Sequence, residues 1–172
     1  MFAHGKESGP QGTKINVLSR VAVQHGWQPL APDFQGMNDP QARVAKLLQA
    51  AEMLTGPLVL VGSSMGGYVM AEASGQLQPA AMLLLAPAVG IPFYPNPDPL
   101  PRAGTLQAVH GWQDEIIPSQ LVIGWCRSHQ VPLQLVNDVH ALQNSLPLLE
   151  ECFSRMLDSL EPGPTGITPQ LG

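Results

Sequence analysis

Residues 62–67 read Gly-Ser-Ser-Met-Gly-Gly, and this stretch decides how the rest of the chain is interpreted. It follows the apolar run Leu58–Val61 and precedes a helical pattern over Tyr68–Gln76. Strand, tight turn and helix in this order are the context in which a G-x-S-x-G turn presents a nucleophilic serine at the end of a sheet. Small residues two positions on either side of the serine let the strand and the helix approach closely. The sequence therefore predicts that Ser64 is a nucleophile.

The same turn predicts a donor for an oxyanion hole. The backbone N–H of Met65 would point toward the negative charge that develops on a substrate oxygen, and the helix N-terminus adds a partial positive charge. The alternative for a glycine-rich turn between a strand and a helix is a phosphate-binding loop. Neither the G-x-G-x-x-G nor the G-K-S/T pattern is present at this turn, which favours the nucleophile.

Apolar runs and amphipathic segments alternate along the chain. The runs expected to form strands are Trp27–Ala31, Leu58–Gly62, Ala81–Leu85, Thr105–Val109 and Pro132–Val136. Helical spacing of apolar residues is found over Thr13–Gln24, from Pro40 to Gly56-Pro57, after Pro118, and over Leu149–Leu160. Strands that are apolar throughout are expected where both faces of a parallel sheet are covered. The pattern predicts an α/β fold, a three-layer sandwich with a mostly parallel sheet.

Two segments depart from this alternation. Residues 87–104 contain six prolines and are expected to form a loop, because proline breaks both helices and central strands. Residues 161–172 are rich in proline and glycine and are expected to form a flexible C-terminal tail. The rest of the chain, residues 1–160, is expected to fold as one domain.

Composition and charge exclude several classes of function. The chain has 172 residues, of which 44% are hydrophobic and 12% charged, so it can bury a real core. Its formal net charge of -5, with no basic run, argues against nucleic-acid binding. No apolar run could span a bilayer, and the N-terminus shows no signal pattern, so no membrane association is expected. Cys126 and Cys152 show no metal-ligand or redox spacing, which favours reduced thiols in a cytoplasmic protein without a metal or cofactor.

A serine hydroxyl needs a base, and in this type of fold the partners follow the serine in the order acid, then histidine. His140 is the only histidine after Ser64 that lies beyond the last expected strand, so it is the predicted base. Asp114 directly follows the strand expected at Thr105–Val109 and is the favoured acid. Other carboxylates remain alternatives at this point, namely Asp98, Glu115 and Asp138.

Four stretches carry a resemblance to a known family: Phe2-Ala3-His4-Gly5-Lys6, Gly62–Gly67, the HGWQDEIIP run at His110–Pro118, and Val139-His140-Ala141-Leu142. Over residues 2–160 the chain resembles the α/β-hydrolase superfamily, particularly its small bacterial esterase-like members without a cap domain. The resemblance implies that Asp114 is the acid and that His110 is structural. It also implies a second oxyanion donor, the backbone N–H of Lys6. Only three residues precede His4, however, where the family has a full buried strand.

The expected function is that of a serine hydrolase that cleaves small soluble carboxylic esters or thioesters through an acyl-enzyme on Ser64. Residues 87–104 are too short for the helical cap that family members often carry, so an open site is expected. Phe93, Tyr94 and Trp112 are candidates for the wall of the substrate pocket. The expected partner is a small ester-type molecule, and the protein itself is expected to be a monomer or homodimer. The alternatives are a carbon–carbon or lactone hydrolase with the same triad, or a non-catalytic binding protein with this fold.

Overall fold

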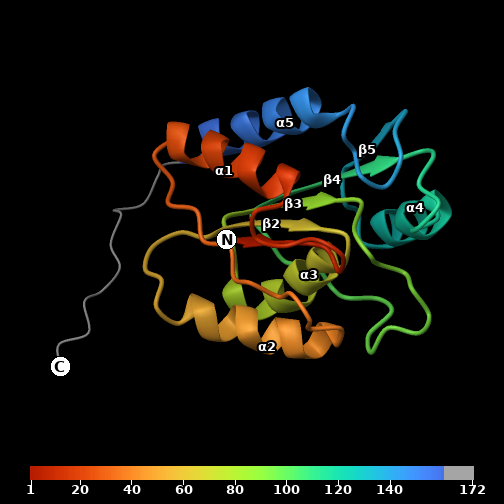
Figure 1. Ribbon diagram of the computed structural model, residues 1–172, viewed down its shortest axis with the longest axis horizontal. Coiled ribbons are helices and arrows are strands. Elements are labelled where there is room, and N and C mark those ends of the chain that lie inside the picture. Colours follow the sequence, from red (N-terminus) through yellow and green to blue (C-terminus); the bar gives the residue numbers. More distant parts are fainter. Residues whose placement is uncertain (161–172) are drawn as a thin grey trace.

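The computed structural model describes residues 1–160, in which a five-stranded parallel sheet lies between two layers of helices (Figure 1). The spatial order of the strands follows the chain: β1 (Phe2–Ala3), β2 (Val59–Ser63), β3 (Ala81–Leu85), β4 (Thr105–Gly111) and β5 (Leu133–Val136). Helices α1 (Thr13–Gln24) and α5 (Leu146–Asp158) cover one face, while α2 (Pro40–Ala51) and α3 (Met65–Leu77) cover the other. Helix α4 (Ser119–Ser128) lies near β4 and β5. The predicted three-layer α/β fold is confirmed.

Alternation along the strands divides the core into two parts, one on each face of the sheet. Leu60 pairs with Met82, and both side chains belong to the cluster that packs against α2 and α3. Their neighbours Val61 and Leu83 also pair, and they belong to the cluster under α1 and α5. Successive side chains of a strand point to opposite faces, so an unbroken apolar run supplies both clusters at once.

Local sequence signals set most helix boundaries. Helix α1 spans the expected residues, and α2 begins at Pro40 after Asp39, whose Oδ1 accepts a hydrogen bond from the Gln41 N–H at 2.9 Å. Proline suits this first position because its missing N–H would have had no partner in the helix. Helix α5 buries Leu149, Cys152, Phe153, Met156 and Leu157 on one stripe, as the helical spacing predicts.

The strand expected at Trp27–Ala31 is wrong. This segment has no regular secondary structure, although it lies beside β1, where the Leu30 carbonyl accepts the Phe2 N–H at 2.8 Å. Pro29 and Pro32 lack the N–H groups that a strand needs for a continuous ladder. Trp27, Leu30 and Ala31 are therefore half-buried against the core without the segment joining the sheet.

Residues 87–104 form neither helix nor strand, as expected, and several hydrogen bonds tie them to the body of the protein. The indole Nε1 of Trp125 donates to the Pro99 carbonyl at 3.0 Å, and the Asn96 N–H donates to the Tyr68 hydroxyl at 3.3 Å. The Arg102 N–H donates to Ser74 Oγ at 2.8 Å. The segment is a tethered loop without a helical cap.

Some sequence predictions lie outside what the fold tests. The tail expected at residues 161–172 lies outside the described residues, and the division into one domain stays a prediction. Cys126 and Cys152 are both buried and free. Within residues 1–160, no helix combines the length and apolarity that crossing a membrane requires.

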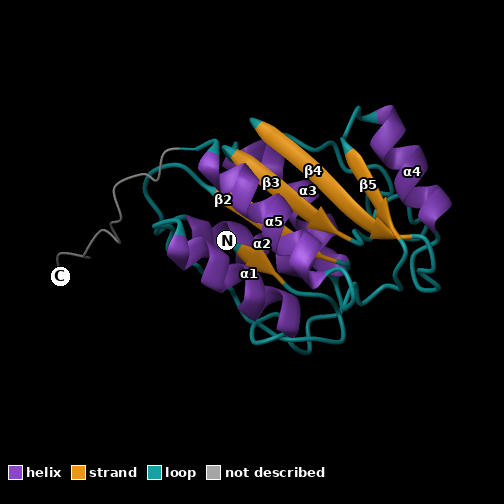
Figure 2. Ribbon diagram, turned by 90° about the horizontal axis from the view of Figure 1, so that it is seen from above, coloured by secondary structure: helices purple, strands orange, loops and turns teal. Residues whose placement is uncertain are grey.

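The strand arrows point the same way, so their carboxyl ends share one edge of the sheet (Figure 2). The turn that holds Ser64 follows β2, and the loop that holds Asp114 follows β4 at this edge. His140 follows β5. The fold thus brings three sequence-distant loops to one place, where ligands bind in open α/β sheets.

Candidate active site

Ser64 adopts a backbone conformation that side chains other than glycine rarely take. Its φ is 56° and its ψ is −122°, between the end of β2 and the start of α3. The surrounding backbone holds it there: its N–H donates to the Leu85 carbonyl, and its carbonyl accepts from the N–H groups of Gly67, Tyr68 and Ala88. A strained residue persists only where neighbours over-determine it, and such residues cluster at functional sites.

The glycines around Ser64 are required by close contact. A Cβ on Gly62 would overlap the carbonyl of Gly66, and a Cβ on Gly66 would overlap the carbonyl of Ala3 in β1. A Cβ on Gly67 would stand 2.8 Å from the Cβ of Pro87. The strand, the turn and the first turn of α3 therefore touch backbone to backbone, which is the physical reason for the glycine spacing.

His140 and Asp114 are joined by a short hydrogen bond. The imidazole Nδ1 lies 2.7 Å from Asp114 Oδ2, across 26 residues of chain. A carboxylate can only accept, so the proton of neutral His140 is on Nδ1 and its Nε2 is free to act as a base. Both His140 and Ser64 line one cavity, and no hydrogen bond joins their side chains within residues 1–160. Catalytic hydrogen bonds commonly tighten only when substrate binds.

The other carboxylates considered from the sequence lie elsewhere. Asp98 Oδ1 pairs with His129 Nε2 at 2.7 Å on the surface. Asp138 is buried, but its oxygens accept from the N–H groups of Val139 and Ser145 and from the Ser145 hydroxyl. Glu115 is exposed. Of the four candidates, only Asp114 contacts His140 in the described structure.

Asp114 is held in its ionised form. Burial alone would raise the pKa of this carboxyl, but hydrogen bonds from His140 and from the N–H groups of Ile117 and Ile116 outweigh it, and the pKa lies below its ordinary value. The buried His110 donates from Nε2 to the Ile117 carbonyl at 3.0 Å, which fixes the same loop. Burial lowers the pKa of His110, so this imidazole stays neutral and structural.

The two residues predicted to supply the oxyanion donors also lie at this cavity. A Cβ on Gly5 would stand 3.3 Å from the Cβ of Ser64, so the Gly5-Lys6 backbone lies directly against the serine. Among the described residues, the backbone N–H groups of Lys6 and Met65 donate no hydrogen bond. Both residues line the cavity that holds Ser64. Two free N–H groups beside one serine are what an oxyanion hole requires.

The cavity at this edge has a volume of about 820 Å³. Phe93 and Tyr94, from the proline-rich loop, form part of its lining as the sequence suggested. Tyr94 packs edge-on against the buried Tyr68 at 4.9 Å between ring centroids, which anchors this wall. Trp112 does not line the cavity: it is 55% exposed, because the chain turns after Gly111 so that Asp114 faces inward.

Comparison with known proteins identifies the family of this chain. The pattern of the alpha/beta hydrolase family matches residues 2–165, which is nearly the whole chain. The chain belongs to this family. No curated protein sequence matches it. Among the described residues of this alpha/beta hydrolase, no three His, Cys, Asp or Glu side chains are grouped as metal ligands would be.

Solved structures of similar proteins share the fold. A protein from Xanthomonas campestris pv. campestris, assigned to the alpha/beta superfamily of hydrolases, is 34% identical, with a TM-score of 0.83 over 92% of this chain and 97% of that chain. A lidless α/β serine hydrolase from Xanthomonas campestris is 18% identical, with a TM-score of 0.79 over 95% and 84% of the two chains. Est1E from Butyrivibrio proteoclasticus is also 18% identical, with a TM-score of 0.74 over 92% and 86%.

Arg43 supports a loop of the candidate site in this alpha/beta hydrolase, and sequence reasoning missed it. It is 1% exposed, and its Nη1 donates to the carbonyl oxygens of His4 at 3.1 Å and Gly5 at 3.3 Å. Its Nε donates to the Met37 carbonyl at 2.7 Å, and its guanidinium lies 5.5 Å from the ring centroid of Phe34. Nothing in the sequence of α2 predicts that this arginine is buried, because only the fold brings the loop of His4 and Gly5 next to it.

His4 completes the support of this loop. The Phe34 N–H donates to His4 Nε2 at 2.9 Å, so the imidazole proton is on Nδ1, which donates to the Gly5 carbonyl at 2.8 Å. Burial lowers the pKa of His4, which keeps this neutral tautomer. Together, His4 and Arg43 hold the loop that carries Lys6, although β1 contains only two residues.

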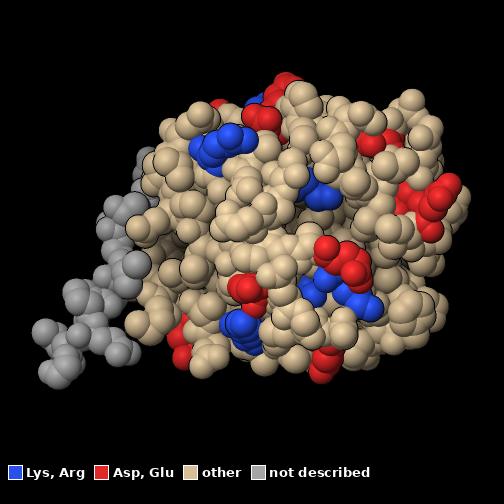
Figure 3. Space-filling view, in the orientation of Figure 1, with Lys and Arg blue, Asp and Glu red and all other residues tan. Residues whose placement is uncertain are grey.

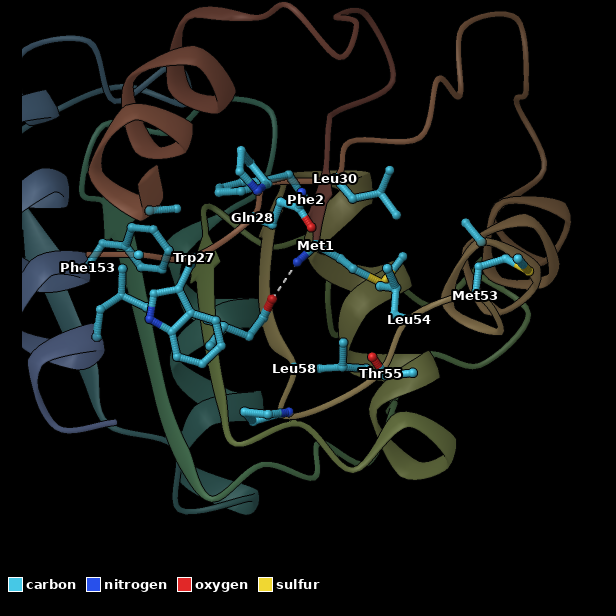
Figure 4. A pocket seen from close by; sticks show the side chains of 17 residues that line it. Met1, Phe2, Trp27, Gln28, Leu30, Met53, Leu54, Thr55, Leu58 and Phe153 are labelled. Atoms are coloured by element: carbon cyan, nitrogen blue, oxygen red, sulfur yellow. Dashed lines mark hydrogen bonds between the residues drawn. The ribbon is translucent and has the colours of Figure 1, made fainter. Parts of the chain in front are cut away.

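A second cavity, of about 460 Å³, lies beside the starting ends of β1 and β2 (Figure 4). Trp27, Leu54, Leu58 and Phe153 are among its apolar lining residues. The amino group of Met1 donates to the Val59 carbonyl at 2.6 Å, and burial lowers the pKa of this amine to about 5. This cavity contains none of the candidate catalytic residues.

Proposed function

We propose that the protein is a serine hydrolase of the carboxylesterase type, which cleaves small soluble esters or thioesters through an acyl-enzyme on Ser64. The observation that carries this proposal is the 2.7 Å hydrogen bond from His140 to Asp114, on the cavity that the strained Ser64 also lines. A base that is oriented by a carboxylate and placed beside a nucleophile is the arrangement that activates a serine hydroxyl.

In the acylation step, His140 Nε2 takes the proton of the Ser64 hydroxyl while the serine oxygen forms a bond to the substrate carbonyl carbon. The carbonyl oxygen becomes an oxyanion, which accepts hydrogen bonds from the N–H groups of Lys6 and Met65. Asp114 stabilises the imidazolium without taking its proton. The bond to the leaving oxygen or sulfur then breaks, and His140 gives its proton to the departing alcohol or thiol.

In the deacylation step, His140 takes a proton from water as the water oxygen attacks the acyl carbon. The second oxyanion is held by the same two N–H groups, and the bond to Ser64 then breaks. His140 returns its proton to the serine oxygen, so that a carboxylic acid leaves and the enzyme is restored.

The preference for small substrates rests on the walls of the cavity. Residues 87–104 add Phe93 and Tyr94 to the lining but contain no helix that could close over the site. Phe93 is 84% exposed, so this side of the mouth is open to solvent. A ferulic acid complex of Est1E from Butyrivibrio proteoclasticus has been solved, and that protein shares this fold. A short acyl or aryl ester fits a cavity of this size and openness.

Reaction with a fluorophosphonate, followed by mass mapping, tests the proposal directly. The folded protein should form one adduct on Ser64, while Ser64→Ala and the denatured wild-type protein should form none. An adduct at this position in folded protein alone would demonstrate an activated nucleophile. Absence of the adduct from protein shown to be folded would reject the proposed mechanism. A panel of esters, thioesters and lactones then assigns the bond that is cleaved.

A cytoplasmic location and a monomeric or homodimeric state complete the proposal. The two buried free cysteines are what a reducing compartment favours. Light scattering of the purified protein measures the oligomeric state.

A further inference from the structure

Lys14 lies in the first turn of α1 and lines the same cavity as Ser64 and His140. Its side chain is half-buried, and its Nζ donates a hydrogen bond to the Ala141 carbonyl at 2.8 Å. Ala141 directly follows His140, so this ammonium group is held beside the proposed base. The mechanism proposed above does not use it.

The charge of Lys14 has no ion-pair partner within residues 1–160. Burial lowers the pKa of Lys14, and the negative charges of Asp114 and Asp138 only partly oppose this effect. The oxygens of these two carboxylates already accept other hydrogen bonds. Even partial burial of a cation without a paired anion carries a cost in free energy, and a bound anion would reduce that cost.

The position of Lys14 in its helix adds to this cost. The first turn of a helix carries a partial positive charge, which disfavours a cation. In α1 this turn contains no acidic residue, and Gly12 at the N-cap supplies no side-chain hydrogen bond. An ammonium group has three donors, of which one is used on Ala141. The others remain for a ligand in the cavity.

The charge of the cavity contrasts with that of the whole chain. Two lysines, Lys6 and Lys14, line it together with one acid, Glu7, while the full chain has a net charge of -5. The face drawn in Figure 3 shows charged side chains scattered among uncharged ones, without a patch of one sign. Recognition of an anion would therefore depend on local contact with Lys14 and not on attraction by the whole surface.

We propose that the Lys14 ammonium group is an anion-binding subsite of the catalytic cavity, and that the preferred substrates are esters or thioesters that also carry a carboxylate group. This inference rests on the proposed function, because it names the substrate class of the same site. The carboxylate would accept from Lys14 Nζ while the ester carbonyl lies against Ser64, with both groups in one small molecule.

Two methyl esters of equal acyl length test the subsite by titration of released acid: methyl butyrate, which is neutral, and the monomethyl ester of succinate, which carries one carboxylate. The wild-type protein should prefer the charged ester. Lys14→Met should raise KM for that ester by about 10- to 100-fold more than KM for methyl butyrate, as expected for a lost hydrogen bond to a charged group. Lys14→Arg should keep much of the preference. Lys46→Met is the matched control, because it removes the same charge outside the cavity.

If Lys14→Met loses the same factor of activity on both esters, the subsite is overturned and Lys14 only supports the loop of His140. An unchanged preference would overturn it as well. A second measurement does not need turnover: succinate should slow fluorophosphonate labelling of Ser64 in the wild type but not in Lys14→Met. If succinate slows labelling in neither protein, the subsite is rejected while the proposed function stands. If Ser64 is not labelled at all, the proposed function is rejected.

Discussion

Arg43 Nη1 lies 3.3 Å from the carbonyl oxygen of Gly5, the residue whose backbone rests against Ser64. This contact joins α2 to the loop that carries the proposed Lys6 oxyanion donor, across 38 residues of chain. It explains how a strand of two residues can lead into a well-held loop. A buried guanidinium supplies the support that a longer strand would otherwise provide.

Replacement of Arg43 by Met should therefore lower both stability and activity. The variant leaves the carbonyls of His4 and Met37 without the arginine donor and leaves the Gly5 carbonyl with His4 alone, which should cost about 2–4 kcal/mol of unfolding free energy. Urea unfolding measures this loss, and turnover of a soluble ester should fall further than the folded fraction does. Arg155→Met is the matched control, because Arg155 is exposed and, within residues 1–160, pairs only with Glu151 on the same helix. Equal stability of the two variants would contradict the assigned role of Arg43.

The backbone strain at Ser64 leads to a prediction about stability. At a φ of 56°, glycine is free of the steric cost that any side chain pays. Ser64→Gly should thus be more stable than Ser64→Ala by about 1 kcal/mol, while both lose fluorophosphonate labelling. Thermal unfolding of the two variants checks the difference. A Ser64→Ala variant more stable than Ser64→Gly would show that the backbone at position 64 is not strained.

The contact between Asp114 and His140 predicts a large kinetic effect. Asp114→Asn should reduce turnover by about 10⁴-fold, because the amide no longer holds the imidazole in the tautomer with a free Nε2. Asp98→Asn is the control, since Asp98 pairs with His129 away from the cavity, and its turnover should stay near that of the wild type. Ester hydrolysis by the purified variants measures both effects. A small loss in Asp114→Asn would remove this residue from the proposed triad.

Asp138 predicts a dependence of stability on pH. Burial opposes ionisation of this carboxyl, but hydrogen bonds from Val139 and Ser145 outweigh it and hold its pKa below the ordinary value. A lowered folded-state pKa means that the ionised form stabilises the fold above about pH 4, the value for an unfolded aspartate. This stabilisation is lost as the pH falls through the lower folded-state value.

Asp138→Asn should accordingly lose about 1–3 kcal/mol at pH 7, and its difference from the wild type should shrink as the pH approaches 2. Urea unfolding at several pH values gives both curves. A difference that stays constant with pH would show that the charge of Asp138 does not stabilise the fold.

Sequence patterns predicted the fold where local physics decides the structure. The apolar run Ala81–Leu85 forms β3 with the expected bounds, because such a run is stable only when both faces of a sheet are covered. Helix α1 also has its expected bounds. The strand predicted at Trp27–Ala31 was wrong, because its apolar side chains pack half-buried against the core while Pro29 prevents a ladder. Burial and strand pairing are separate properties that an apolar pattern does not distinguish.

The candidate site likewise combines features that the sequence predicts with features that only the structure reveals. By itself, the sequence determined the turn at Ser64, because its glycines are needed wherever strand and helix meet this closely, and it placed His140 after the last strand. Only the tertiary structure decided which carboxylate contacts His140, since Asp98, Glu115 and Asp138 satisfy the same order along the chain. The contacts of Arg43 and Lys14 were likewise visible only in the tertiary structure. Their contacts with Gly5 and Ala141 join distant segments, and such contacts depend on how helices pack on a sheet.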